Sequence, residues 1–270
     1  MIKQAIIPLA GLGTRLLPLT SVFAKELLPI NGRPGIEYIL DECIEAGIKE
    51  VIFIISKKKM MIKKYFYNDK FYKDIIKRKK DPRILKEYKK ILKYKKMIKF
   101  VFQDKPLGTG DAVLRTKKFI KDKYFLMLLP DDLIIKKNCS KSMIDIHKKL
   151  NTSVMASMKI NKDEVSRWGI YDIKEKIDSM NFIIKSVVEK PTVKLAPSNN
   201  AVIGRYILPK TIFSKLLNLK PSKGGEIHIT DAIQLLINDN NKFVAHNFSG
   251  KYLDCGTMSG YINSTLEITK

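Results

Sequence analysis

The chain has 270 residues, of which 45% are hydrophobic and 29% charged, which is typical of a folded globular protein with one large domain or two small ones. This composition excludes a disordered chain, a collagen-like repeat and a disulfide scaffold. The formal net charge of +24 is compatible with a nucleic-acid partner, but only seven of the 51 basic residues are arginines, so we attribute the charge to an A/T-biased genome and expect no nucleic-acid partner.

The N-terminal part of the chain alternates between apolar runs and helically spaced apolar residues. Residues 3–10 predict a short buried strand that ends at Gly11, and residues 34–46 predict a helix. The continuous apolar run 51–55 is typical of a strand buried on both faces, so this strand–helix–strand unit favours a parallel sheet. Residues 57–96, the most lysine-rich stretch, predict two or three surface helices with a solvated basic face.

The same alternation continues beyond this stretch and becomes richer in strands after Gly169. No internal repeat, low-complexity linker or clear domain boundary is visible. We expect strands at 98–102, 125–129, 153–158, 170–173, 182–188, 201–208 and 243–247, and helices at 111–119, 140–150, 209–217, 230–237 and 260–268.

A glycine loop follows the first predicted strand, in the run Gly11-Leu12-Gly13-Thr14-Arg15. Leu16 stands where a dinucleotide fingerprint needs its third glycine, and no Gly-Lys-Ser/Thr follows as in a P-loop. A tight turn without a ligand is one interpretation. Two cations, Arg15 and Lys25, favour the other, because they can grip different phosphates of a nucleoside triphosphate while the glycines let the backbone approach it.

The run from Gly11 to Arg15, followed by Pro18 and Lys25-Glu26-Leu27-Leu28-Pro29, resembles the nucleotide-binding signature of the sugar-1-phosphate nucleotidyltransferases. The likeness covers nearly the whole chain and is weakest in residues 57–96. It is strongest to family members that transfer a uridylyl group from UTP to α-D-glucose 1-phosphate, giving UDP-glucose and pyrophosphate. The resemblance implies that Ala10, Gly11, Gly13 and Thr14 bind the nucleotide and that Arg15 and Lys25 act in catalysis.

A second candidate site comprises Gln103 and the run from Leu107 to Ala112, between a predicted strand and a predicted helix. Such a position lies at the ligand-binding edge of an open α/β sheet, although a plain helix start has the same pattern. The resemblance implies that Gln103 and the backbone of Gly108 face the uracil, since a side-chain amide offers both a donor and an acceptor. Asp111 stands where many relatives carry histidine.

Two acidic positions are candidate magnesium ligands. Asp131 and Asp132 end a predicted buried strand, where carboxylates can hold Mg²⁺ together with phosphates or can be solvated turn residues. The resemblance implies that Asp131 is a catalytic metal ligand and that Asp254 is a second one, with Mg²⁺ as the cofactor.

A fourth candidate site contains Glu189 and Lys190 at the end of another predicted strand. An ordinary Glu–Lys pair is one interpretation. The resemblance implies a sugar-phosphate site in which Glu189 accepts bonds from sugar hydroxyls, Lys190 meets the phosphate as a catalytic cation, and Gly169 and Gly204 complete the pocket. The run from Gly224 to Ile227 also matches the family, without a definite role. The three histidines form no evident cluster.

Together these features predict an α/β protein with a Rossmann-like, mostly parallel mixed sheet flanked by helices, as in the nucleotide-diphospho-sugar transferases. We expect one domain over 1–270, with a nucleotide-binding half at about 1–135 and a sugar-phosphate-binding half at about 136–270. The resemblance implies a homo-oligomer, dimer or tetramer. Three alternatives stay open: a sister transferase that uses dTTP or another sugar phosphate, a non-catalytic regulatory relative that binds UDP-sugars, and a nucleic-acid-binding protein.

The remaining sequence features concern the compartment. Cys43, Cys139 and Cys255 are far apart and have no metal-site spacing, so free thiols are expected. The N-terminus lacks the pattern of a signal peptide, and no apolar run reaches the ~20 residues that span a bilayer. We expect a soluble, cytoplasmic protein with no membrane partner.

Overall fold

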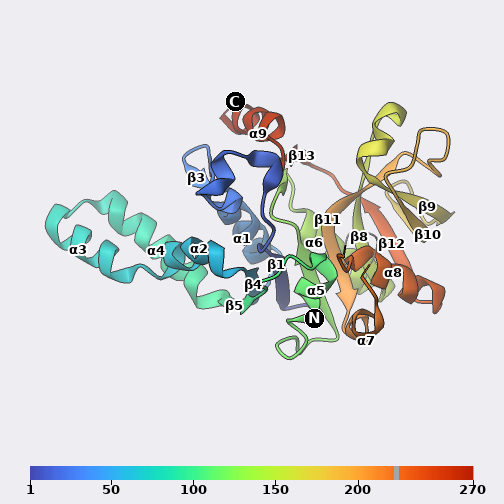
Figure 1. Ribbon diagram of the computed structural model, residues 1–270, viewed down its shortest axis with the longest axis horizontal. Coiled ribbons are helices and arrows are strands. Elements are labelled where there is room, and N and C mark those ends of the chain that lie inside the picture. The colour runs from blue at the N-terminus through green and yellow to red at the C-terminus, as the bar shows by residue number, and fades with distance from the viewer. Residues whose placement is uncertain (222–224, 270) are drawn as a thin grey trace.

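The computed structural model describes residues 1–221 and 225–269. A nine-stranded mixed sheet runs through the molecule, in the order β5-β4-β1-β6-β11-β8-β12-β10-β9 (Figure 1). The strands of this sheet are β1 (Gln4–Pro8), β4 (Glu50–Ile55), β5 (Ile98–Phe102), β6 (Tyr124–Leu128), β8 (Ser153–Lys159), β9 (Gly169–Lys176), β10 (Asn181–Glu189), β11 (Asn200–Pro209) and β12 (Phe243–Asn247).

The first four of these strands form the parallel part of the sheet. β4 pairs with β1 and β5, and β1 pairs with β6, all in parallel. Helix α1 (Gly35–Glu45) connects β1 to β4, as the strand–helix–strand pattern predicts. Residues 51–55 of β4 are fully buried, because helices cover both faces of the sheet there.

The other half of the sheet is mainly antiparallel. β11 runs antiparallel to β6, β8 and β9, and β10 runs antiparallel to β9 and β12. A β11–β9 pairing closes five of these strands into a ring. Only four of the nine pairings of this sheet in the described part of the chain are parallel, so the expectation of a mostly parallel, Rossmann-like sheet is wrong beyond β6. Part of the physical reason is the short turn between β9 and β10, which joins neighbouring strands directly and makes them antiparallel, whereas parallel neighbours require a long crossover connection.

Helices cover both faces of the sheet, as predicted. Alternate residues of the central strands separate the two cores: Ile7 and Phe53 belong to one, and Ile6 and Ile52 to the other. The first core contains α1 and α6 (Cys139–Leu150), and the second contains α5 (Gly108–Leu114), α7 (Ile212–Asn218) and α8 (Ile229–Asn238).

The lysine-rich stretch forms three helices, which confirms the expectation of two or three. They are α2 (Met60–Tyr67), α3 (Asp69–Lys79) and α4 (Pro82–Met97), and they extend away from the sheet (Figure 1). We call residues 57–97 the basic arm. Its apolar residues Ile62, Phe66 and Ile91 pack into the first core, whereas most of its lysines are exposed.

Some short elements were not expected. β7 (Asp132–Ile135) pairs with β13 (Lys251–Asp254), and β2 (Pro29–Ile30) pairs with β3 (Arg33–Pro34). The predicted helix 260–268 is α9 (Met258–Thr269), near the C-terminus. None of the helices that the structure describes is long and apolar enough to cross a membrane.

Candidate active site

The loops that follow β1, β5 and β6 line a cleft of about 470 Å³. These three strands are parallel, so their carboxyl ends meet at one edge of the sheet, where α/β proteins bind ligands. The cleft therefore brings together the glycine loop, the region of Gln103 and Gly108, and the candidate metal ligand Asp131. Its lining includes Ala10, Gly11, Gly13, Thr14, Lys25, Gln103, Gly108 and Asp131.

The glycine loop leaves the backbone open to a ligand. Gly13 has a φ of 71°, a conformation that favours glycine, and its carbonyl accepts a bond from the Thr20 hydroxyl at 2.8 Å. A Cβ at Gly11 would meet nothing within 4 Å. The loop leads into a short 3₁₀ turn, Thr14–Leu16, whose Arg15 side chain is 65% exposed.

Asp131 pairs with two cations at the edge of the cleft. Lys25 Nζ lies 2.7 Å from Asp131 Oδ2, and Arg15 Nη2 lies 3.4 Å from the same oxygen. Burial lowers the pKa of Lys25, but Asp131 outweighs burial and raises it. Burial likewise raises the pKa of Asp131, yet the pair with Lys25 holds it below its ordinary value. Both groups therefore stay charged at neutral pH.

A second cleft, of about 420 Å³, also contains Asp131. Arg15, Lys190 and Asp254 line it, with Trp168 among the other lining residues. Asp131 therefore lies where two clefts meet, and each cleft has a cation at its wall. This arrangement can hold two anions side by side and bring their phosphates toward one point.

Gly256 lies directly against both candidate metal ligands and against Arg15. A Cβ at Gly256 would lie 2.8 Å from Asp131 Oδ2, 2.9 Å from Arg15 Nη2 and 3.2 Å from Asp254 Oδ1. Within residues 1–221 and 225–269, no three or more histidine, cysteine, aspartate or glutamate side chains could hold a metal ion by themselves. Mg²⁺ usually takes one or two carboxylates and completes its shell with water and phosphate, so this pair of oxygens fits it.

The neighbouring Asp132 has a different surrounding. Its Oδ1 accepts a bond from the Tyr252 hydroxyl at 2.7 Å, and its Oδ2 accepts one from the Gly204 amide at 2.8 Å. Burial, and then the charge of Asp131, raise the pKa of Asp132 to about 6. Gly204 touches Asp132 closely, and a Cβ there would lie 2.5 Å from Leu129 Cβ. Gly204, predicted to bind sugar phosphate, thus holds the turn that carries Asp131.

Gln103 presents only one kind of hydrogen-bonding group to the cleft. Its Nε2 donates to Asp111 Oδ2 at 2.7 Å and to the Gly108 carbonyl at 3.0 Å. Both donors of the side-chain amide are therefore used, and Oε1 keeps no partner among the described residues. Within the part of the chain that the structure describes, Gln103 therefore has a free acceptor and no free donor, whereas we expected both to be available; that it faces a base stays a prediction.

The predicted sugar-phosphate residues come from the β9–β10 pair, in which Glu189 lies opposite Gly169. A Cβ at Gly169 would lie 3.2 Å from Glu189 Oε2. Lys190 has a φ of 45° and donates its backbone amide to the Trp168 carbonyl at 3.0 Å. This bond directs Lys190 to the second cleft, where its side chain is 63% exposed.

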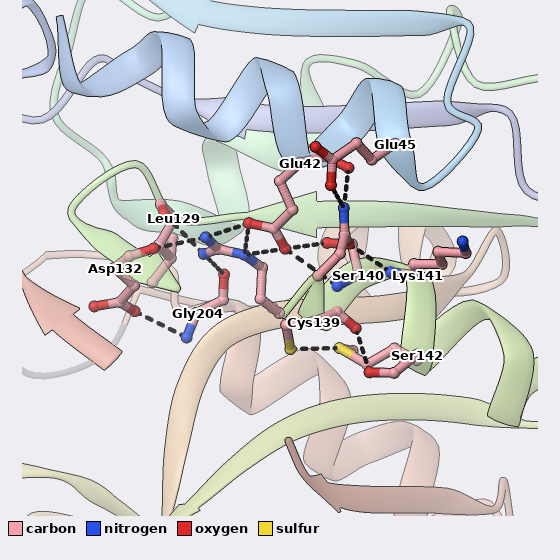
Figure 2. A network of polar contacts seen from close by, with 12 residues as sticks. Glu42, Glu45, Leu129, Asp132, Cys139, Ser140, Lys141, Ser142 and Gly204 are labelled. Atoms are coloured by element: carbon pink, nitrogen blue, oxygen red, sulfur yellow. Dashed lines mark hydrogen bonds and ion pairs between the residues drawn. The ribbon is translucent and has the colours of Figure 1, made fainter. Parts of the chain in front are cut away.

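Sequence reasoning missed a buried network behind the Asp131 turn. Arg205, which is fully buried, donates to both carboxylate oxygens of Glu42 and to the carbonyls of Leu129, Asp132 and Gly204. Figure 2 shows Glu42, Leu129, Asp132 and Gly204 gathered in this network. An arginine inside the apolar run of β11 is a sequence signal for a buried charge, although it does not identify Glu42 as the partner.

Sequence reasoning also missed Glu26 and Lys59. Lys59 Nζ donates to the two carboxylate oxygens of Glu26 at 2.8 and 2.9 Å, and both side chains are buried. Glu26 lines the first cleft, that of about 470 Å³, next to Lys25. Of the run from Gly224 to Ile227, Gly224 lies outside the described residues, while Ile227 packs against Gly108 and Glu226 lines the same cleft.

Comparisons with known proteins cover the whole chain. The profile of the family described as nucleotidyl transferase matches residues 4–270. The UTP–glucose-1-phosphate uridylyltransferase of Bacillus subtilis is 36% identical over 267 residues, which are 98% of this chain and 90% of that protein. A UDP-glucose pyrophosphorylase crystallised with UDP-glucose has 35% identity and a TM-score of 0.87, over 100% of this chain and 99% of that one. The UTP-bound UGPase of Acinetobacter baumannii has 33% identity and a TM-score of 0.89, over 99% and 93%.

Proposed function

The chain belongs to the nucleotidyl transferase family, and we propose that it transfers the uridylyl group of UTP to α-D-glucose 1-phosphate, giving UDP-glucose and pyrophosphate. The observation that carries this function is a likeness at 36% identity, over 98% of the chain, to an enzyme named for that reaction. The two clefts that meet at Asp131 support it, because the reaction needs two phosphate-bearing substrates beside each other.

In this reaction a phosphate oxygen of glucose 1-phosphate attacks the α-phosphorus of UTP. A new P–O bond forms to that oxygen, and the bond between the α-phosphorus and the bridging oxygen of the β-phosphate breaks, so pyrophosphate leaves. The substrate supplies the nucleophile. The protein therefore has to position two anions and offset their charge, without a covalent intermediate of its own.

The cations of the two clefts fit these tasks. The glycine loop and Arg15 are proposed to hold the β- and γ-phosphates, and Lys25 to offset charge at the α-phosphate. Lys25 is already protonated beside Asp131, so its ammonium group can donate to a phosphate oxygen as well as to that carboxylate. Lys190 at the wall of the second cleft is proposed to bring in the sugar phosphate, with Glu189 and Gly169 on the adjoining strands binding the sugar.

We further propose Mg²⁺ as the cofactor, held by Asp131 and Asp254 together with phosphate oxygens. The position of Gly256, which has a carboxylate oxygen of each residue close to it, supports this assignment because it brings the two carboxylates near each other. When bound, the ion would neutralise charge on the triphosphate.

The acceptor on Gln103 supports a pyrimidine with an N–H at position 3, which both uracil and thymine have. The alternative substrate dTTP therefore presents the same edge as UTP, and only a measurement separates the two. We propose UTP because the full-length relatives at 36% identity are named for it.

The assembly and the compartment are proposals as well. Leu17, Val22 and Phe23 expose large apolar side chains close together in the sequence, which supports a homo-oligomer, dimer or tetramer. Light scattering of the purified protein tests it. The three cysteines are free thiols, which supports a reducing compartment such as the cytoplasm.

The test of the proposed function is pyrophosphate release by the purified protein with Mg²⁺, glucose 1-phosphate and each nucleoside triphosphate in turn. We expect release with UTP and its loss when the metal is chelated. Release with dTTP alone would replace uridylyl transfer by thymidylyl transfer. Binding of UDP-glucose without any release, with several sugar phosphates, would favour a regulatory protein instead.

A further inference from the structure

We propose that Asp111 is a positioning residue that sets the base choice of this enzyme. Its carboxylate holds the amide of Gln103 so that only the amide oxygen faces the base, and we place this oxygen opposite N3, where it admits uracil and thymine and excludes cytosine. The inference rests on the proposed function, since it assumes that the cleft beside Gln103 receives the base of a nucleoside triphosphate.

The orientation of the Gln103 amide follows from the chemistry of its two partners. Asp111 Oδ2, at 2.7 Å, and the Gly108 carbonyl oxygen, at 3.0 Å, both lie next to Nε2. A carbonyl and a carboxylate accept hydrogen bonds and cannot donate them. Exchanging the nitrogen and oxygen of Gln103 would bring three oxygens together, so the amide has one allowed orientation.

Asp111 is itself fixed by Arg115, the residue that directly follows α5. Arg115 Nε lies 2.8 Å from Asp111 Oδ2, and Nη2 lies 3.3 Å from Oδ1. A guanidinium group donates only, so it keeps the Asp111 side chain an acceptor toward Gln103. The three side chains form a chain of bonds that starts on an exposed helix face and ends at the base.

The backbone that carries these residues is also fixed. Gly110 donates its amide to the Ile227 carbonyl at 2.7 Å, and Ile227 donates its amide to the Leu107 carbonyl at 2.8 Å. Gly108 has a φ of 93°, and a Cβ there would lie 2.5 Å from the Ile227 oxygen. The Gln103 backbone amide is bonded to the Ile55 carbonyl at 2.9 Å. The start of α5 and the end of β5 therefore hold a constant relative position.

An acceptor opposite N3 of the base distinguishes the pyrimidines. Uracil and thymine carry a hydrogen on N3 and can donate it to Gln103 Oε1, whereas N3 of cytosine carries a lone pair. Cytosine would leave two acceptors facing each other in a site where Gln103 is only 4% exposed. Sites built to bond one N–H reject analogues that lack it by up to ~10⁴-fold, so we expect strong preference for UTP over CTP.

The test is the double variant Asp111→Asn with Arg115→Met. The first change replaces the carboxylate by an amide, and the second removes the donors that would hold the oxygen of that amide toward Gln103. The new amide can then donate to Gln103, and only the Gly108 carbonyl still favours the original orientation, so the ratio of kcat/KM for CTP to that for UTP should rise ~10-fold. Asp145→Asn is the matched control, because Asp145 is an exposed helix residue paired only with Lys148 among the described residues. A ratio equal to that of the wild type overturns the proposal.

A second measurement decides the question if the variant loses its turnover. The increase of Tm caused by UTP and by CTP, without sugar phosphate, reports base binding alone. A larger CTP effect relative to UTP in the double variant than in the wild type supports the proposal, and an unchanged relation overturns it. Wild-type protein that releases no pyrophosphate with UTP would overturn the proposed function, while the Tm comparison would still decide the role of Asp111.

Discussion

Arg205 and Glu42 form a buried ion pair behind the turn that carries Asp131, with Nη2 2.9 Å from Oε2 and Nε 3.0 Å from Oε1. The same guanidinium donates to the Leu129 carbonyl at 3.1 Å and the Asp132 carbonyl at 2.6 Å, on either side of Asp131. Glu42 comes from α1 and also accepts bonds from Ser140 at the start of α6. The position of Asp131 thus depends on strand β11 and two helices.

Replacing this pair separates its effect on stability from its effect on geometry. Arg205→Met alone leaves the Glu42 carboxylate buried with only the bonds from Ser140 and no opposite charge, and should destabilise the fold by ~3–5 kcal/mol. The double variant Glu42→Leu with Arg205→Met removes both charges and should recover most of that stability. It still lacks the bonds to the turn, so its turnover should stay ~10²-fold low, as expected for a misplaced catalytic group. Urea unfolding and pyrophosphate release measure the two quantities. Normal turnover in the double variant would show that the pair only stabilises the fold.

The basic arm contributes one lysine that pairs with Glu26, a residue that lines the first cleft. Lys57, Lys58 and Lys59 are consecutive, but only Lys59 is buried, against Glu26. Lys59→Met leaves the Glu26 carboxylate unpaired next to the triphosphate site, so the KM for UTP should rise ~10-fold or more through charge repulsion.

Two further variants check this interpretation of Lys59. Lys58→Met removes an exposed lysine and should leave the KM for UTP as it is. Adding Glu26→Gln to Lys59→Met removes the unpaired charge, so the double variant should regain most of the affinity for UTP. Steady-state kinetics with variable UTP give kcat and KM separately. A double variant that is no better than Lys59→Met alone would mean that the pair acts through packing and not through charge.

Arg15 and Lys190 should affect turnover and not folding. Their side chains are 65% and 63% exposed, so alanine at either position should change the free energy of unfolding by less than ~0.5 kcal/mol. Loss of one charged contact to a transferring phosphate lowers the rate by ~10²–10³-fold. Lys185→Ala serves as the control, because Lys185 is equally exposed on β10 and pairs with Asp172. Near-normal kcat/KM in Arg15→Ala or Lys190→Ala would contradict the role assigned to that residue.

Local patterns in the sequence sufficed for most individual elements but not for their arrangement. The run 51–55 and the helix at 34–46 are visible in the sequence, because burial of neighbouring residues creates a local period. The place of β11 between β6 and β8 is not visible, because it depends on pairing with strands far away in the chain. The antiparallel half of the sheet was missed for this reason.

In the candidate site, too, local motifs predict some features, while others depend on residues far apart in the sequence. The glycine loop and the Asp131 position follow from motifs of consecutive residues, and the structure brings them to one cleft. The state of Gln103 does not follow from its own motif, because Asp111 and Gly108 take both of its donors. Arg205 and Glu42 are 163 residues apart, so no local signal connects them.

A substitution at Gly256 offers a test of the proposed magnesium site that does not replace either proposed ligand. A methyl group there would lie 2.8 Å from Asp131 Oδ2 and 3.2 Å from Asp254 Oδ1, closer than atoms in ordinary contact. Gly256→Ala should therefore push the carboxylates apart and raise the Mg²⁺ concentration needed for half-maximal pyrophosphate release by ~10–100-fold. Asp254→Asn should move the same midpoint in the same direction, since it removes a negative ligand while Asp131 remains. If both variants follow the wild-type Mg²⁺ titration while their rates fall, the metal binds elsewhere, and Asp254 serves the turn at Gly256 and Thr257, whose groups it already bonds.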